Sequence, residues 1–283
     1  MKKIFSVFGM ISLICLSFII SEKTAYVVKD IDEIMIEIKQ NQEKYKQEPT
    51  NAKIVNNTII PGLNGKKIDI EKSYKEMKKI GTFNEKYIIY NEVKPTISSK
   101  REYEKYIISG NSKKNTVSLI FLVNENDKID NIIKILNQKK IKATFFVDGY
   151  WLEENNELTL ELIRNNHTVG NLGYKLNYQD AGFIWMNNIL KKLGKQKTNY
   201  CYANDNIEDL KACSLQKNYT IKPNIIVKEN PLTEIKAQIQ AGSLIALPVN
   251  EKTNQELELI INYINSKGYN LENIQKHLSE KNN

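Results

Sequence analysis

The stretch IKATFFVDGYWLEENNELTLELIRNNHTVGN, residues 141–171, decides the fold of this chain. It opens and closes with short runs rich in apolar and β-branched residues, at 141–147 and 167–172, which have the composition of buried strands. Glu153 and Glu154 lie where a helix would start, a position at which the helix dipole favours acidic side chains. A strand, a helix and a second strand in this order form a unit whose two strands run parallel.

The same alternation extends in both directions from this stretch. Further strand-like runs lie at 117–123, 198–202, 218–227 and 242–249, with a short last one near 268–271. Between them, Ile129, Ile132, Ile133 and Leu136 have the spacing of one helix face, and Leu257, Ile260, Ile261 and Ile264 repeat it. Asn230 and Pro231 form a good helix start. About seven repeats of this kind predict a parallel α/β fold, either a doubly wound sheet or a barrel.

Residues 141–171 resemble the core pattern of the NodB-homology polysaccharide deacetylases, carbohydrate esterase family 4. In that pattern an ATFF strand is followed by a glycine, a helix and a GHEIGNH-like strand. The resemblance implies a distorted, incomplete (β/α) barrel of about seven strands with a groove at the carboxyl ends of the strands. It also implies zinc or another divalent metal in family members.

The residues at the family's metal and catalytic positions are replaced. Where the family has TFDDGP, this chain has LIFLVNEN, so Leu122 and Val123 stand in place of the base and of a metal ligand. The HxxxH pair corresponds to LGYKL, with Leu172 and Leu176 in place of both imidazoles. An RPP-like motif falls at TNYCYAND and an LLH-like motif at IALPV, which places Cys201 and Pro248 at the remaining positions. The resemblance thus predicts no catalytic residue, no metal and no cofactor, and an apolar rim.

Amide hydrolysis by such a site needs a metal that lowers the pKa of bound water to about 7, and a base that takes its proton. Leucine and valine do neither, and the chain has only two histidines, His167 and His277, both expected to pack. Our leading hypothesis is a catalytically inactive, deacetylase-like pseudoenzyme that binds cell-wall glycan or an envelope protein. A divergent active deacetylase with a relocated site at Glu125, Asp148 or Glu153 is the alternative, and a structural scaffold with no carbohydrate ligand is the third.

Glycan recognition uses aromatic faces, and several aromatic residues lie in the loops or helix starts that would frame the groove. We take Trp151, Tyr174 and Tyr150 as candidate groove residues, with Tyr178 and Trp185 nearby, although aromatic residues in such positions more often pack inside the protein.

Four segments are expected along the chain. Residues 1–23 have two lysines followed by an apolar run, which favours an uncleaved signal anchor over a cleaved signal peptide. Residues 24–49 form a helical stalk, 50–110 a small α+β module, and 111–283 the NodB-like domain. Within the module, Asp69 is expected to cap a helix that ends near Gly81. The localisation that follows is the cell membrane with an extracytoplasmic domain, or secretion if the signal is cleaved.

The net charge of +8 would suit an anionic glycan or a membrane surface, but the lysines are scattered, as on any solvated surface. No recognition motif indicates nucleic acid. Cys201 and Cys213 could pair in an oxidising compartment, and buried free thiols are the slightly favoured interpretation.

Overall fold

The computed structural model describes residue 17 and residues 32–179, 181–193 and 199–282. The predicted signal anchor and the start of the predicted stalk lie outside these residues. Within the described parts, no helix combines the length and apolar character needed to cross a bilayer. The described residues form two compact units, one from residues 32–49 and 65–93 and the other from residues 50–64 and the described residues from 94 onward. We call them the small unit and the barrel unit, and each is described by itself.

The barrel unit is built on a curled half-barrel sheet. Its strands are β1 (Lys53–Val55), β2 (Thr58–Ile60), β5 (Tyr106–Ile107), β6 (Thr116–Val123), β7 (Thr144–Val147), β8 (Thr168–Asn171), β9 (Tyr200–Tyr202), β10 (Tyr219–Ile221), β11 (Ile225–Ile226), β12 (Leu244–Pro248) and β13 (Asn270–Leu271). Their order is β1-β2-β5-β10-β9-β8-β7-β6-β12-β11, and β13 pairs with β6. All neighbours are parallel except β1 and β2. The prediction of a parallel α/β fold is confirmed, and the resemblance, not the periodicity, identified it as barrel-like.

The strand prediction differs from the structure in two ways. Among the described residues the sheet has eleven strands in place of about seven, since β1, β2 and β5 also join it, and the predicted run 218–227 is divided. The structure divides it into β10, which pairs with β9, and β11, which pairs with β12 on the other arm of the sheet. Pro223 lies between them and has no N–H to donate to a neighbouring strand. The sheet is therefore open, with β1 and β11 as its edge strands, and residues 222–224 lead from one arm of the sheet to the other.

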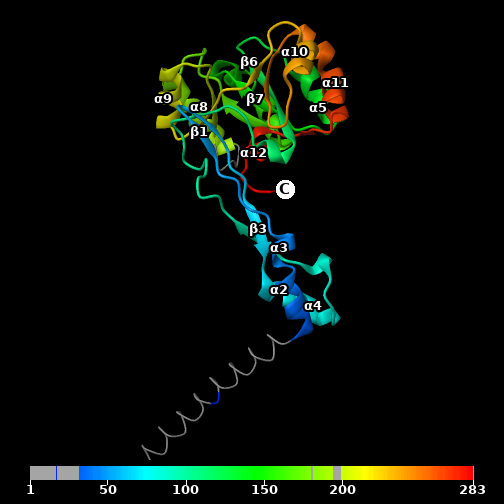
Figure 1. The fold of residues 1–283 in the computed structure, drawn as a ribbon. Coiled ribbons are helices and arrows are strands. Elements are labelled where there is room, and N and C mark those ends of the chain that lie inside the picture. Colours follow the sequence, from blue (N-terminus) through cyan, green and yellow to red (C-terminus); the bar gives the residue numbers. More distant parts are fainter. Residues whose placement is uncertain (1–16, 18–31, 180, 194–198, 283) are drawn as a thin grey trace, which may run out of the picture. The chain divides into compact units, whose positions relative to one another are not determined.

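Helices cover the outside of the sheet (Figure 1). They are α5 (Asp130–Gln138), α6 (Gly149–Glu154), α7 (Asn156–Arg164), α8 (Ala181–Leu193), α9 (Ile207–Leu215), α10 (Pro231–Gln238) and α11 (Glu251–Ser266). Two short helices, η2 (Ser112–Lys114) and α12 (Ile274–His277), lie instead at the amino end of the barrel, where Ile274 packs in the interior cluster. Both predicted helix faces, on α5 and α11, are buried in the cluster between sheet and helices, together with Val117, Leu119, Phe121 and Val123 of β6. Alternate residues of the same strand face the barrel interior, where Ile120 packs with Phe146 of β7 and Tyr202 of β9.

The small unit contains α2 (Glu33–Gln40), α3 (Gln42–Tyr45), β3 (Gly65–Ile68), α4 (Ile70–Ile80), η1 (Glu85–Tyr87) and β4 (Tyr90–Val93). Its core is made of Ile34, Ile38, Ile68, Met77 and Ile88. The predicted caps of α4 are confirmed: the Asp69 carboxylate accepts the Lys72 N–H, and Gly81 ends the helix with a φ of 77°.

The division into two units corrects the expected bounds of the module, 50–110, and the expected helical stalk, 24–49. Residues 50–64 and 94–110 belong to the barrel unit because β2 and β5 hydrogen-bond into its sheet beside β10. The described part of the stalk is not a bare helix, because α2 packs on α4 inside the small unit through Ile34 and Ile38.

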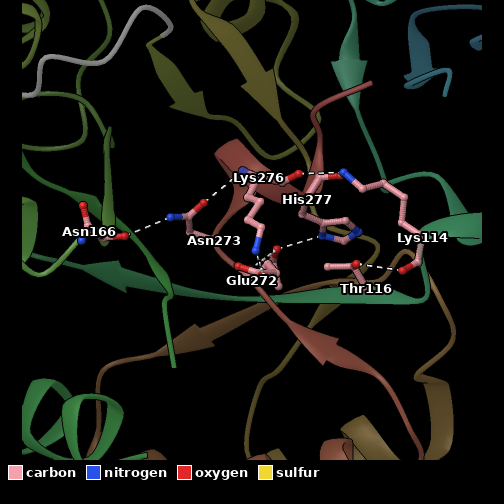
Figure 2. Close-up of polar contacts among 8 residues, drawn as sticks. Lys114, Thr116, Asn166, Glu272, Asn273, Lys276 and His277 are labelled. Carbon is pink, nitrogen blue, oxygen red and sulfur yellow. Dashed lines mark hydrogen bonds and ion pairs between the residues drawn. The ribbon is translucent and has the colours of Figure 1, made fainter. Parts of the chain in front are cut away.

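The last residues of the chain complete the amino-terminal end of the barrel. The Lys114 ammonium donates to the carbonyls of Lys276, His277 and Ser279. Figure 2 shows Lys114 reaching the backbone of Lys276 and His277. Burial lowers the pKa of Lys114 to about 8. The buried His277 ring hydrogen-bonds through Nδ1 to the Ser118 hydroxyl, 2.8 Å away, and lies against the Cα of Gly110, where a Cβ would come 2.1 Å from Nε2. Since the Ser118 hydroxyl donates to the Glu272 carbonyl, His277 carries its proton on Nδ1. These contacts fix the C-terminal segment, residues 272–282.

Candidate functional site

The carboxyl ends of the central strands form two rows of neighbouring residues. One row runs through Pro248, Leu122, Phe146 and Gly170, and the next through Val123, Val147, Asn171 and Cys201. Because consecutive residues of a strand face opposite sides of the sheet, the first row faces the barrel interior and the second faces the helices. We call the interior end of the first row the rim.

The replaced positions divide between these two sides. Leu122 and Leu172 pack in the interior cluster, and Pro248 lies beside Leu122. Val123 is buried in the cluster under α5 and α11, and Cys201 packs with Tyr178 and Phe183 on the helix side. Leu176, in contrast, is 58% exposed. The prediction that Val123 lines the rim is therefore wrong for this structure, because its side chain points away from the interior.

Apolar side chains fill the interior at the rim. Gly170 lets the Phe146 ring lie across β8, where a Cβ would come 2.4 Å from that ring. The Phe146 ring packs against Tyr202 with 5.8 Å between centroids, and Leu122 and Leu172 belong to the same cluster. None of these four side chains offers the imidazole or carboxylate that zinc prefers. In the parts of the chain that the structure describes, no three His, Cys, Asp or Glu residues gather as a metal site.

Both histidines lie away from the rim and serve packing. The buried His167 precedes β8; its Nδ1 accepts the Ala143 N–H at 3.1 Å, and its ring meets Phe145 edge-on. Burial, with a smaller contribution from the positive charge of Lys142, lowers the pKa of His167 to about 4. Burial, with a smaller contribution from Lys114, lowers the pKa of His277 to about 3. Both imidazoles are therefore neutral at pH 7.

The carboxylates considered for a relocated site do not gather around an imidazole. Asp148 follows β7 and is buried, and it accepts the backbone N–H groups of Tyr150 and Leu176, both at 2.8 Å. Its role is to cap α6 and hold the loop after β8. Glu125 and Glu153 are exposed, and Glu153 accepts the hydroxyl of Tyr174.

Three partly exposed aromatic side chains belong to α6, α8 and the loop after β8, and we call them the aromatic surface: Tyr150, Tyr174 and Trp185. The Lys175 ammonium lies 4.7 Å from the centre of the Tyr150 ring, and Tyr174 meets Trp185 edge-on at 6.4 Å. The hydrogen bond to Glu153 raises the pKa of Tyr174 to about 12. Lys175 was missed in the sequence because its contact with Tyr150 joins the loop after β8 to α6, and no local spacing predicts it.

Trp151 requires a correction. Its side chain is 1% exposed, it packs in the cluster under the helices, and its Nε1 donates to the Asp127 carbonyl at 2.8 Å. A ring enclosed in this way has no face for a sugar, so the candidate groove residues reduce to Tyr150 and Tyr174, with Trp185. Tyr178 is buried too, and its hydroxyl donates to the Tyr202 carbonyl.

Cys201 and Cys213 form a disulfide that joins β9 to α9, with 6.0 Å between the Cα atoms. The favoured expectation of free thiols is therefore corrected. Cys201 is the middle residue of β9 and is fully buried, so its side chain has a structural function here.

Comparison with known proteins finds a family model that matches part of the barrel unit. Residues 109–219 match the model of the polysaccharide deacetylase family, a range that begins just before β6 and ends at β10. The chain is 28% identical over 288 residues to the uncharacterized protein YlxY of Bacillus subtilis, covering 91% of this chain and 87% of that protein.

Two solved structures cover the same extent of the chain. BA3943 of Bacillus anthracis, a pseudoenzyme of carbohydrate esterase family 4, is 25% identical and has a TM-score of 0.66, covering 89% of this chain and 97% of that one. A BA3943 mutant with restored enzymatic activity is 24% identical and has a TM-score of 0.68, with 89% and 100% covered.

Proposed function

We infer that this protein, whose barrel unit is a degenerate NodB-like polysaccharide deacetylase domain, is a catalytically inactive relative of the deacetylases. The observation that carries this inference is the apolar packing of Leu122, Leu172 and Phe146 where a metal and its water would lie. A reaction that develops negative charge on an attacked carbonyl gains nothing from these side chains. The likeness to BA3943, itself a pseudoenzyme, supports the same conclusion.

We further propose that the protein works by binding, and that its ligand is cell-wall glycan held at the aromatic surface. Tyr150 and Tyr174 offer partly exposed rings, and Trp185 is 36% exposed. Sugar rings stack on such faces, and the neighbouring Lys175 and Glu153 supply hydrogen-bonding groups. An envelope protein is the second candidate partner, because Leu176 and Ile184 add exposed apolar side chains nearby in the sequence.

An extracytoplasmic location, with residues 1–23 as the membrane anchor or as a cleaved signal, is proposed on two grounds. The two N-terminal lysines precede an apolar run, and the disulfide between Cys201 and Cys213 belongs to an oxidising compartment.

One co-sedimentation experiment tests activity and binding together. The full-length protein in mild detergent is mixed with insoluble, N-acetylated cell-wall glycan, with and without added zinc, and both sedimented protein and released acetate are measured. We expect sedimentation without acetate release in either condition. Tyr174→Ala and Trp185→Ala should each reduce sedimentation several-fold, since stacking contacts contribute on the order of 1 kcal/mol.

The matched control is Tyr263→Ala, which removes a partly exposed tyrosine on α11 that also lies against lysines. Acetate release that requires zinc would overturn the inference of inactivity. If Tyr174→Ala and Trp185→Ala both bind glycan as well as the wild-type protein does, the aromatic surface is not the glycan site.

A further inference from the structure

The barrel unit has a cavity at the opposite end from the rim. Its volume is about 190 Å³, and it lies at the amino ends of β9 and β10, where Tyr200 and Tyr219 are the first residues of their strands. Pockets for drug-sized molecules usually exceed about 300 Å³, so this cavity fits a smaller ligand of roughly one ring.

Tyrosine rings make one wall of the cavity. Tyr219 packs against Tyr200 with 6.2 Å between ring centroids, and Tyr103 packs against Tyr219 at 4.8 Å. The Tyr219 hydroxyl accepts the Arg101 N–H, which fixes this ring in place. The wall therefore presents a rigid, flat surface to a ring-shaped ligand.

The hydroxyl of Tyr200 is a polar group in need of a partner. Tyr200 is 5% exposed and lines the cavity, and among the residues that the structure describes none forms a hydrogen bond with its hydroxyl. The hydroxyl is not sealed inside the protein but opens on the cavity, where water or a ligand can reach it. A ligand hydroxyl in the cavity would accept or donate this hydrogen bond in place of water.

The C-terminal segment forms the facing wall and is held firmly. The buried Glu280 carboxylate accepts the Ser98 hydroxyl and both the N–H and the hydroxyl of Ser99, at 2.6 to 2.9 Å. Lys114 holds the carbonyls of residues 276, 277 and 279 from the other side (Figure 2). A wall fixed before binding reduces the entropy that a ligand must lose.

The charges around the cavity favour an acidic ligand. Lys100 and Lys281 line it and are exposed, and within the described parts of the chain neither forms an ion pair with a carboxylate. The negative charge of Glu280 is already met by three donors. Gln275, also on the lining, adds an amide that both donates and accepts.

We propose that this cavity binds a single acidic sugar ring, packed on Tyr219, hydrogen-bonded to Tyr200 and Gln275, and with its carboxylate between Lys100 and Lys281. This site is independent of the aromatic surface at the rim. It gives the pseudoenzyme a second ligand position that needs neither a metal nor a catalytic base.

The test uses three probes that separate ring, hydroxyl groups and charge: D-glucuronate, D-glucose and benzoate. Binding to the full-length protein is measured by ligand-observed NMR at up to about 10 mM probe, which loads a site of millimolar Kd. We expect glucuronate to bind more tightly than glucose, and benzoate to bind most weakly, since it keeps the ring and the charge but has no hydroxyl groups.

Tyr200→Phe should weaken glucuronate binding about five- to tenfold by removing one buried hydrogen bond while keeping the ring. Its matched control is Tyr202→Phe, two residues further along the same face of β9 and outside the cavity lining. Exchanging both Lys100 and Lys281 for Gln should make glucuronate bind as weakly as glucose, whereas the same exchange at Lys191 and Lys192 of α8 should change nothing.

Three results would overturn the proposal: no binding of any probe, benzoate binding as tight as that of glucuronate, or unchanged affinity in Tyr200→Phe with its thermal unfolding intact. None of these results bears on the co-sedimentation experiment, because the variants tested there lie at the other end of the barrel.

Discussion

At the scale of single residues, Leu122 and Val123 are adjacent in sequence but belong to different environments. Leu122 is half-buried at the rim, whereas Val123 is fully buried under the helices. The deacetylases that the chain resembles have acidic residues at both positions. Introducing a carboxylate here would therefore lower the stability of the fold by different amounts at the two positions. A carboxylate at Leu122 can reach solvent, but one at Val123 would be enclosed by apolar side chains.

Leu122→Asp and Val123→Asp test this difference. We expect Leu122→Asp to lower the free energy of unfolding by about 1–2 kcal/mol and Val123→Asp by on the order of 4 kcal/mol, because only the latter buries an unpaired acid. Urea unfolding of each variant at pH 7 measures both values. Equal losses would mean that the end of β6 turns so that both side chains reach the rim.

From the sequence we could predict which residues lie at the strand ends, but not whether each side chain is buried or exposed there. The motif spacing identified Leu122, Leu172 and Pro248 correctly as neighbours of the interior, since strand ends meet at one edge of a parallel sheet. It did not distinguish Trp151 from Tyr174, because both follow strand ends. Their exposure depends on packing against Asp127 in one case and on Gly149 and Gly182 in the other, contacts that come from distant loops.

At the scale of elements, periodicity located two of the helices, α5 and α11, and polar caps located α4 and the start of α10. The face of α11 and the caps of α4 follow directly from local sequence. Partner choice among strands does not, because hydrogen bonding between β2 and β5 joins residues almost fifty positions apart, and nothing near residue 58 encodes it. The predicted boundaries of the small module, 50 and 110, are therefore wrong, because residues 50–64 and 94–110 belong to the barrel unit.

The disulfide between β9 and α9 is the element-scale feature with the clearest energetic effect. It closes a loop with a sequence separation of 12 residues, which in the chain-entropy model stabilises the fold by about 3 kcal/mol. Exchanging both Cys201 and Cys213 for Ala should lower the urea midpoint accordingly. Adding a reductant should lower the midpoint of the wild-type protein and leave the double variant unchanged; a reductant effect on the double variant would point to another cause.

At the scale of the whole molecule, acid should destabilise the protein earlier than its carboxylates alone would. His167 and His277 have folded-state pKa values lowered to about 4 and about 3, against an ordinary value of 6.5. The unfolded chain therefore binds two protons that the folded chain excludes as the pH falls below 6.5. Their stabilising contribution is complete above pH 6.5 and is lost towards pH 4.

Urea unfolding at pH 7, 6, 5 and 4 measures this loss, which we expect to reach on the order of 3 kcal/mol or more by pH 4. His277→Gln should reduce the slope, since Gln donates to Ser118 without titrating, and His167→Gln should do the same independently. A slope that neither variant changes would show that carboxylates, not the histidines, set the acid limit.

The position of the C-terminal segment has a consequence for the order of events during folding. Ile274, His277, Leu278 and Glu280 are all buried at the amino end of the barrel. The segment is held there by Ser98, Lys114 and Ser118, which lie more than 150 positions away in the sequence. Contacts that close so long a loop cost the most chain entropy before they are rewarded. We therefore expect the strand and helix units to form first and the amino end of the barrel to close in a late step of folding.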